Sequence, residues 1–305
     1  MILNASGCLD ALTAPEVARS LDAFVTKTVT PLPRGGNPPV RIAETDVGLL
    51  NSIGLANPGR ERFLGQTLPR LVRELEGLPV WVSVGGFCAD DYAATCAALR
   101  RFDGVEAIEL NLSCPNVDDA PETAAEIVAA CREATALPLW AKLSPATWDL
   151  AEVARAVADA GADGLSLVNT IRGLALDERT LRPRLGTAVG GLSGPALKPI
   201  ALAAVFACHR ATRLPIVGMG GVRSGRDALE LLAAGASHVA LGTILFADPD
   251  APSRVRAELA SELGALGLHR PEQAVGLAHD TVRSDFHTAV EDVEKSLLIG
   301  KNASH

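Results

Sequence analysis

Short runs of β-forming residues alternate with longer amphipathic segments rich in Ala, Leu, Glu and Arg along almost the whole chain. This alternation predicts repeated βα units around a parallel sheet. Nine runs are candidate strands: residues 2–5, 23–28, 48–51, 80–84, 107–110, 139–143, 164–168, 216–218 and 239–241. A (β/α)8 barrel needs eight strands and about 250 residues, which suits a chain of 305 residues. The sequence therefore predicts one α/β domain, a (β/α)8 TIM barrel over residues 1–305, with the run 48–51 outside the barrel.

Helices and long connections follow from the same pattern. Helices are predicted over residues 14–20, 61–75, 92–100, 120–134, 150–160, 196–212, 225–234 and 252–266. Two connections, residues 30–59 and 169–194, are longer than a barrel needs and rich in Gly, Pro, Asn and Arg. Both follow predicted strands, so we expect them over the carboxyl-terminal face, where barrels place their sites. Residues 279–305 are expected to form a final helix and a frayed tail.

Composition and charge exclude several classes of protein. The net charge is −8 and the basic residues are scattered, which argues against a nucleic-acid partner. Six cysteines, at positions 8, 88, 96, 114, 131 and 208, form no CxxC pair, so neither a metal site nor an iron–sulfur cluster is expected in this chain. Reduced thiols and the lack of an apolar run long enough to span a bilayer predict a soluble, cytoplasmic protein without a membrane partner. The histidines at 209, 238, 269, 279 and 287 are expected on the surface or on helices.

The segment Asn111-Leu112-Ser113-Cys114-Pro115-Asn116 follows an apolar run and places a thiol between two amides. At the carboxyl end of a parallel strand, amides can hold a planar heterocycle while a thiolate moves a proton. An isolated cysteine near a strand end is more often a buried structural thiol. The catalytic interpretation therefore depends on other motifs.

Two glycine-rich connections near the end of the chain predict an anion site. Residues 218–225 read Gly-Met-Gly-Gly-Val-Arg-Ser-Gly, and Leu241-Gly242-Thr243 ends the next predicted strand. Glycines allow the backbone to approach a phosphate, and barrels commonly bind phosphate after strands seven and eight. The alternative is that these glycines only permit tight turns.

These motifs, taken together and in order from Asn4 to about Phe246, resemble class 1 dihydroorotate dehydrogenases. The matching segments are residues 4–7 (NASG), 26–28 (TKT), 51–59 (NSIGLANPG), 111–116 (NLSCPN), 141–145 (AKLSP), 168–170 (VNT), 190–195 (GGLSGP) and the two glycine loops. The resemblance implies an FMN-binding (β/α)8 barrel that oxidises dihydroorotate to orotate in pyrimidine biosynthesis. No metal ligand is implied.

The resemblance also implies catalytic roles. Cys114 would be the base for the C5 proton, because a thiol loses its proton nearer neutrality than a serine hydroxyl does. Lys142 would stabilise the negative charge that develops near N1 of the flavin when it receives the C6 hydride. Lys27 would contact both the substrate carboxylate and the flavin. Backbone N–H groups of Ile53, Gly54 and Leu55 would assist at the carboxylate.

The remaining implied site residues bind the pyrimidine ring or the cofactor. The pyrimidine positions are Asn51, Asn111, Asn116, Asn169 and Thr170. The flavin positions are Ser6, Lys27, Thr28, Asn111, Lys142, Val168, Gly194, Gly220, Gly221, Gly242 and Thr243. Each has a structural alternative, such as a surface lysine or a turn asparagine.

Three features depart from the family pattern. The chain starts close to Asn4, so the N-terminal hairpin that commonly closes the barrel floor is expected to be reduced. The segment after Asn116 is shorter than the family's glycine-rich loop, which puts closure over the substrate in doubt. Ser83 stands where many relatives have an asparagine near the flavin.

The family has two electron-acceptor types, one linked to fumarate and one linked to NAD through a partner subunit with FAD and a 2Fe-2S cluster. Residues 53–55 and 191–199 are more similar to the NAD-linked 1B catalytic subunit than to the fumarate-linked 1A type, whereas the shortened loop and residues 223–228 weaken that assignment. The resemblance implies dihydroorotate and orotate as ligands, and a homodimer or a heterotetramer with the partner. The alternatives are an enzyme similar to tRNA dihydrouridine synthase and a flavin-binding subunit without turnover.

Overall fold

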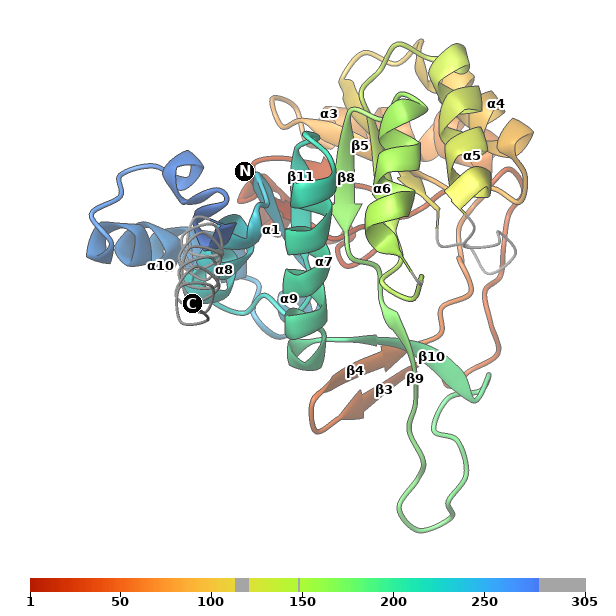
Figure 1. The fold of residues 1–305 in the computed structure, drawn as a ribbon. Helices are drawn as coiled ribbons and strands as arrows, with labels where there is room; N and C mark the ends of the chain where they lie inside the picture. The colour runs from red at the N-terminus through yellow and green to blue at the C-terminus, as the bar shows by residue number, and fades with distance from the viewer. Residues whose placement is uncertain (113–120, 148, 280–305) are drawn as a thin grey trace, which may run out of the picture.

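The computed structural model describes residues 1–112, 121–147 and 149–279, and its central feature is a parallel eight-stranded sheet (Figure 1). The strand order is β1-β12-β11-β8-β7-β6-β5-β2, and a bridge between Leu3 and Ala23 joins the two ends into a barrel. The strands are β1 (Ile2–Asn4), β2 (Phe24–Val25), β5 (Val80–Val84), β6 (Val105–Asn111), β7 (Leu139–Leu143), β8 (Gly164–Leu167), β11 (Ile216–Met219) and β12 (His238–Leu241). The predicted TIM barrel is confirmed.

Helices surround the barrel close to their predicted positions. They are α1 (Pro15–Arg19), α2 (Arg60–Arg62), α3 (Leu68–Glu74), α4 (Ala89–Leu99), α5 (Pro121–Ala134), α6 (Leu150–Asp159), α7 (Lys198–Ala211), α8 (Gly225–Ala234), α9 (Ile244–Ala247) and α10 (Ala251–Ala265). The helix predicted over 61–75 is interrupted by a π-helical segment, Phe63–Thr67. None of the described helices is long and apolar enough to cross a membrane. The tail predicted as a helix lies outside the described residues, except for His279.

A second, antiparallel sheet lies beyond the carboxyl ends of the barrel strands (Figure 1). Its order is β3-β4-β10-β9, with β3 (Ile42–Thr45), β4 (Gly48–Asn51), β9 (Ile171–Leu174) and β10 (Val189–Ser193). The placement of 48–51 outside the barrel is therefore confirmed. The two long connections contribute two strands each and pair with one another where β4 meets β10. This pairing links segments about 140 residues apart, so no local sequence pattern announces it.

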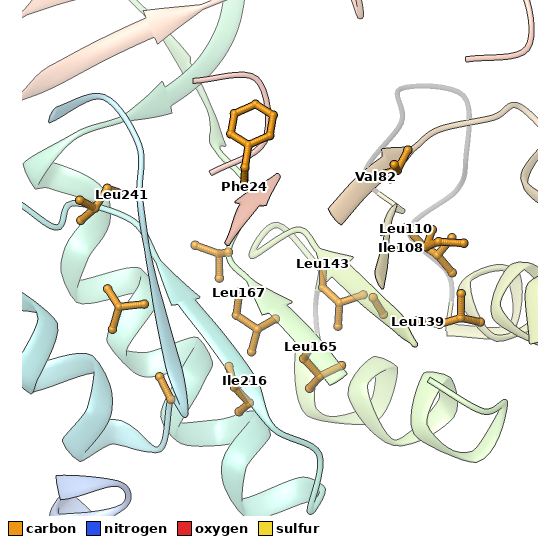
Figure 2. Close-up of a cluster of buried hydrophobic side chains, with 14 of the residues drawn as sticks. Phe24, Val82, Ile108, Leu110, Leu139, Leu143, Leu165, Leu167, Ile216 and Leu241 are labelled. Atoms are coloured by element: carbon orange, nitrogen blue, oxygen red, sulfur yellow. The ribbon is translucent and has the colours of Figure 1, made fainter. Parts of the chain in front are cut away.

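Side chains of the barrel strands alternate between two apolar clusters. Leu139, Leu143, Leu165 and Leu167 point outward and pack in the cluster between the sheet and the helices, as Figure 2 shows. A separate cluster fills part of the barrel interior: Leu3, Ala23, Val25, Trp81, Ala107, Trp140, Val217, Met219 and Ala240. The barrel is thus a packed core and not a pore.

Aromatic rings fill the amino-terminal end of this interior. The ring centroids of Trp81 and Trp140 are 4.7 Å apart, and the His238 ring lies 5.8 Å from Trp140. His238 begins strand β12, so its predicted location on a surface or helix is wrong. Burial lowers its pKa to about 4, which keeps the ring neutral beside the tryptophans at neutral pH.

Candidate active site

A cavity of about 1300 Å³ lies at the carboxyl-terminal end of the barrel, under the second sheet. Every predicted site residue that the structure describes lines it: Ser6, Lys27, Thr28, Asn51, Ile53, Gly54, Leu55, Asn111, Lys142, Val168, Asn169, Thr170, Gly194, Gly220, Gly221, Gly242 and Thr243. Cys114 and Asn116 lie outside the described residues. The cavity gathers segments from both halves of the chain, as the fold of a barrel requires.

Lys142 is the buried cation of the barrel interior. It lies in β7, only 5% of the residue is exposed, and its Nζ donates a hydrogen bond of 2.9 Å to Ser6 Oγ. The carboxylate of Glu109 is 3.6 Å away, and its side chain is 1% exposed. Burial of an ion pair is costly unless further hydrogen bonds satisfy both groups, and Ser83 Oγ donates one of 3.1 Å to Glu109.

Sequence reasoning missed Glu109, although a signal was present. Glu109 interrupts the apolar run 107–110, where a half-buried strand would place a carboxylate only if it had a partner. It shares the inner face of β6 with Ala107 and Asn111, whereas Ile108 and Leu110 point outward. In the register of β6 with β7, Trp140 lies opposite Glu109 and Lys142 lies opposite Asn111, so Lys142 could have been recognised as the partner only once that register was known.

A chain of buried hydrogen bonds connects Glu109 to the amides predicted for the pyrimidine. Ser83 Oγ lies 3.0 Å from Thr28 Oγ1, which accepts a 3.2 Å hydrogen bond from Asn111 Nδ2. Asn169 Nδ2 in turn donates to Asn111 Oδ1 at 3.3 Å. Ser83, the departure from the family pattern, is therefore completely buried within this network.

The second sheet supplies the opposite wall of the cavity. Asn51, at the end of β4, donates to the Gly191 carbonyl at 3.2 Å, which anchors its side chain to β10. The following loop has a positive φ at Gly54 (71°) and at Leu55 (55°). A Cβ at Gly54 would lie 2.5 Å from the Asn37 backbone nitrogen, so only glycine fits. This tight turn places the Ile53-Gly54-Leu55 backbone on the cavity.

Glycines form the end of the cavity near β11 and β12. Gly194, Gly220 and Gly221 have φ values of 90°, 124° and 76°, which side-chain-bearing residues rarely adopt. A Cβ at Gly221 would also lie 2.8 Å from Lys198 Cβ. A Cβ at Gly242 would lie 3.8 Å from Ala5 Cβ and 3.9 Å from Cys8 Sγ, so it would make ordinary van der Waals contacts there. The arrangement suits a phosphate approached by backbone groups.

Cys8 is a further cavity residue that the sequence did not identify. It lies beside the Gly242 loop and lines the same cavity. Burial raises the pKa of its thiol, although Lys142 and Lys27 oppose this effect. The Cys8 thiol therefore lines the cavity in its neutral, protonated form at neutral pH, and this form is a poor nucleophile.

The fold and the cavity define a barrel enzyme with a polar site over its carboxyl-terminal face and a glycine cradle after its last two strands. The family model for dihydroorotate dehydrogenase matches residues 1–263. The chain belongs to the dihydroorotate dehydrogenase family, a family of oxidoreductases.

Curated relatives agree on the family and differ in the named electron acceptor. A dihydroorotate dehydrogenase B (NAD(+)) catalytic subunit from Desulforudis audaxviator is 45% identical over 268 residues, which cover 86% of this chain and 87% of the relative. The protein of the same name from Listeria monocytogenes is 41% identical over 277 residues, 88% of this chain and 90% of the relative. A putative dihydroorotate dehydrogenase A (fumarate) from Solibacter usitatus is 43% identical over 266 residues, 84% of this chain and 86% of the relative. Identity therefore does not separate the two acceptor types.

Proposed function

We propose that this chain oxidises dihydroorotate to orotate with bound FMN, in the cytoplasmic synthesis of pyrimidines. The observation that carries the proposal is the shared location of the predicted site residues. All those that the structure describes line one cavity, although they come from segments spread between Ser6 and Thr243. The free cysteines among the described residues agree with a reducing compartment.

The cavity fits FMN together with a small second ligand. Pockets for one small molecule are typically about 300–1,000 Å³, and this cavity has about 1300 Å³. The glycine cradle of Gly194, Gly220, Gly221 and Gly242 would receive the phosphate. Ser6, Thr28, Val168 and Thr243 would complete the flavin contacts. We assign Lys142 to the ring, because its ammonium is buried in the barrel interior, where it donates to Ser6 Oγ.

Substrate binding would depend on a lysine and several amides. Lys27 would attract the substrate carboxylate, and the Ile53-Gly54-Leu55 backbone would hold it. Asn51 comes from the second sheet, whereas Asn111 and Asn169 follow barrel strands, so the amides would hold the ring from both sides of the cavity. Asn116 and Thr170 are assigned to the same ring. Amides suit a pyrimidine because they offer a donor and an acceptor together.

The reaction needs a base on the face of the substrate opposite the flavin. Bound FMN would accept the hydride from C6. Cys114 is assigned as the base that removes the C5 proton, two residues after Leu112, whose backbone N–H donates to the Lys142 carbonyl at 3.2 Å. Lys142 would stabilise negative charge on the flavin, an electrostatic contribution made without moving a proton. Orientation of both reactants in one cavity supplies the rest.

Anaerobic mixing of the purified protein with dihydroorotate tests the proposal. Oxidised-flavin absorbance should be lost, with one orotate formed for each FMN reduced. Bound FMN that dihydroorotate does not bleach would contradict turnover and favour a flavin-binding subunit. A protein that binds no FMN would contradict the whole assignment.

We further propose that electrons leave through a partner subunit carrying FAD and a 2Fe-2S cluster, in a heterotetramer built on a homodimer of this chain. The support is that several relatives are named as catalytic subunits, which implies a second subunit in those enzymes. Co-purification of a second protein with flavin and iron, and NAD reduction by the complex, would support this. Full turnover by the isolated chain with fumarate would overturn it.

A further inference from the structure

Glu109 is a buried carboxylate with no assigned role in the proposed reaction. It lies on the inner face of β6, one layer below Asn111, and is 1% exposed. Its carboxylate oxygen accepts a hydrogen bond of 3.1 Å from Ser83 Oγ and lies 3.6 Å from Lys142 Nζ, each on a neighbouring strand. The inference below rests on the proposed function, because it concerns how this carboxylate acts on the FMN and pyrimidine positions.

The ion pair controls the charge that Lys142 presents to the cavity. An ammonium buried without a counterion would carry an uncompensated positive field into a region of low dielectric. Glu109 offsets part of that field, and Ser6 Oγ holds the other side of the Lys142 ammonium. The pair would therefore moderate how strongly Lys142 stabilises negative charge on a bound flavin.

The same carboxylate fixes the direction of the hydrogen-bond chain. An ionised carboxylate only accepts, so the single hydroxyl proton of Ser83 is committed to Glu109. Thr28 must then donate to Ser83, which leaves Thr28 Oγ1 to accept from Asn111 Nδ2. Asn111 Oδ1 is consequently turned toward Asn169 Nδ2. Each hydrogen bond in this series, from Asn169 through Asn111, Thr28 and Ser83, is therefore donated in the direction of Glu109.

We infer that Glu109 is a positioning residue for both halves of the site. Its carboxylate moderates the positive field that Lys142 would present to a bound flavin, and it orients the Asn111 and Asn169 amides through Ser83 and Thr28. Glu109 itself does not line the cavity. Flavin electrostatics and pyrimidine recognition are thereby connected to one buried charge.

The charge effect is tested with the FMN-loaded Glu109→Gln variant, because glutamine keeps the size and one acceptor oxygen. Sulfite adds to oxidised flavins and places negative charge on the ring, so its dissociation constant reports the local field. We expect sulfite to bind about tenfold more tightly, equivalent to a rise of about 30 mV in the two-electron potential. Glu106→Gln, exposed on the same strand, is the matched control and should leave both values unchanged.

The orienting effect is tested separately with Ser83→Ala. This variant removes the hydroxyl that links Glu109 to Thr28 and keeps the charges of Glu109 and Lys142. We expect orotate to bind the FMN-loaded protein about five- to tenfold more weakly, while sulfite affinity stays within twofold. Ser166→Ala is the control, because Ser166 Oγ is equally buried in β8 and has no hydrogen-bond partner in the described structure.

The outcomes separate this inference from the proposed function. Unchanged or weaker sulfite binding in Glu109→Gln, or unchanged orotate binding in Ser83→Ala, would overturn the inference while wild-type bleaching by dihydroorotate stands. Failure of the wild type to bind FMN or to be bleached would instead reject the proposed function. If Glu109→Gln does not fold, unchanged orotate binding in Ser83→Ala still overturns the inference, because the inference requires both effects.

Discussion

The two ends of the barrel interior are built by the same strands and have opposite chemistry. Strand β5 places Trp81 in the apolar cluster and Ser83 in the polar network two residues later. Strand β7 does the same with Trp140 and Lys142. Two residues along a strand span about 7 Å. Packing and chemistry are thus separated by one layer of side chains, so substitutions at the two ends should affect different quantities.

The largest expected effect is at the polar end, with Cys114→Ala. The variant should retain FMN and its thermal stability while turnover falls by up to about 10⁴-fold, since the proposed base is lost. Steady-state turnover and flavin absorbance measure this. Cys114→Ser should recover activity only at raised pH, and normal activity of both variants at neutral pH would remove Cys114 as the base.

At the apolar end, Trp140→Ala should lower stability and leave turnover nearly unchanged. Loss of a buried indole that packs on Trp81 should lower the free energy of unfolding by about 3–5 kcal/mol. Turnover per mole of folded, FMN-loaded enzyme should change by no more than about threefold. Chemical denaturation measures the first quantity, with Leu181→Ala at a 71% exposed position as the control. A Trp140→Ala variant that is stable but inactive would contradict the prediction that the apolar end governs stability and the polar end governs turnover.

Lys27→Met should affect substrate binding more than stability. Lys27 lines the cavity and is assigned to the substrate carboxylate. Loss of a charge-assisted hydrogen bond worth about 1.5–3 kcal/mol should weaken orotate binding by roughly 10- to 150-fold. Orotate titration of the flavin spectrum measures the effect. An unchanged dissociation constant would place the carboxylate elsewhere in the cavity.

The smallest effect concerns pH. The folded-state pKa of His238 is about 4, below its ordinary value of 6.5, because burial disfavours the charged ring. Its contribution to stability is therefore present above pH 6.5 and is lost as pH falls toward 4. After allowance for partial solvent screening, we expect about 1–2 kcal/mol.

His238→Gln should show a shallower loss of stability than the wild type over this pH range, measured by denaturation at several pH values. Equal slopes would show that the neutral ring beside Trp140 does not govern acid sensitivity.

Local pattern predicted the barrel because its strands and helices are contiguous and differ in periodicity. The glycine cradle could also be predicted from the sequence, since a positive φ at Gly220 and Gly221 requires glycine. The pairing of Asn51 with Gly191 could not be predicted from the sequence, because it joins two long connections that are far apart along the chain. Glu109 was missed for a related reason, since its partner Lys142 becomes a neighbour only through strand register.

We propose that the polar end of the barrel holds FMN and a pyrimidine side by side. A crystal structure of the purified protein grown with orotate tests it most directly. We expect the flavin phosphate in the Gly220-Gly221 and Gly242-Thr243 loops and the flavin ring against Lys142, with orotate between Lys27 and the amides of Asn51, Asn111 and Asn169. Orotate bound outside this cavity, or a flavin phosphate away from those loops, would contradict it.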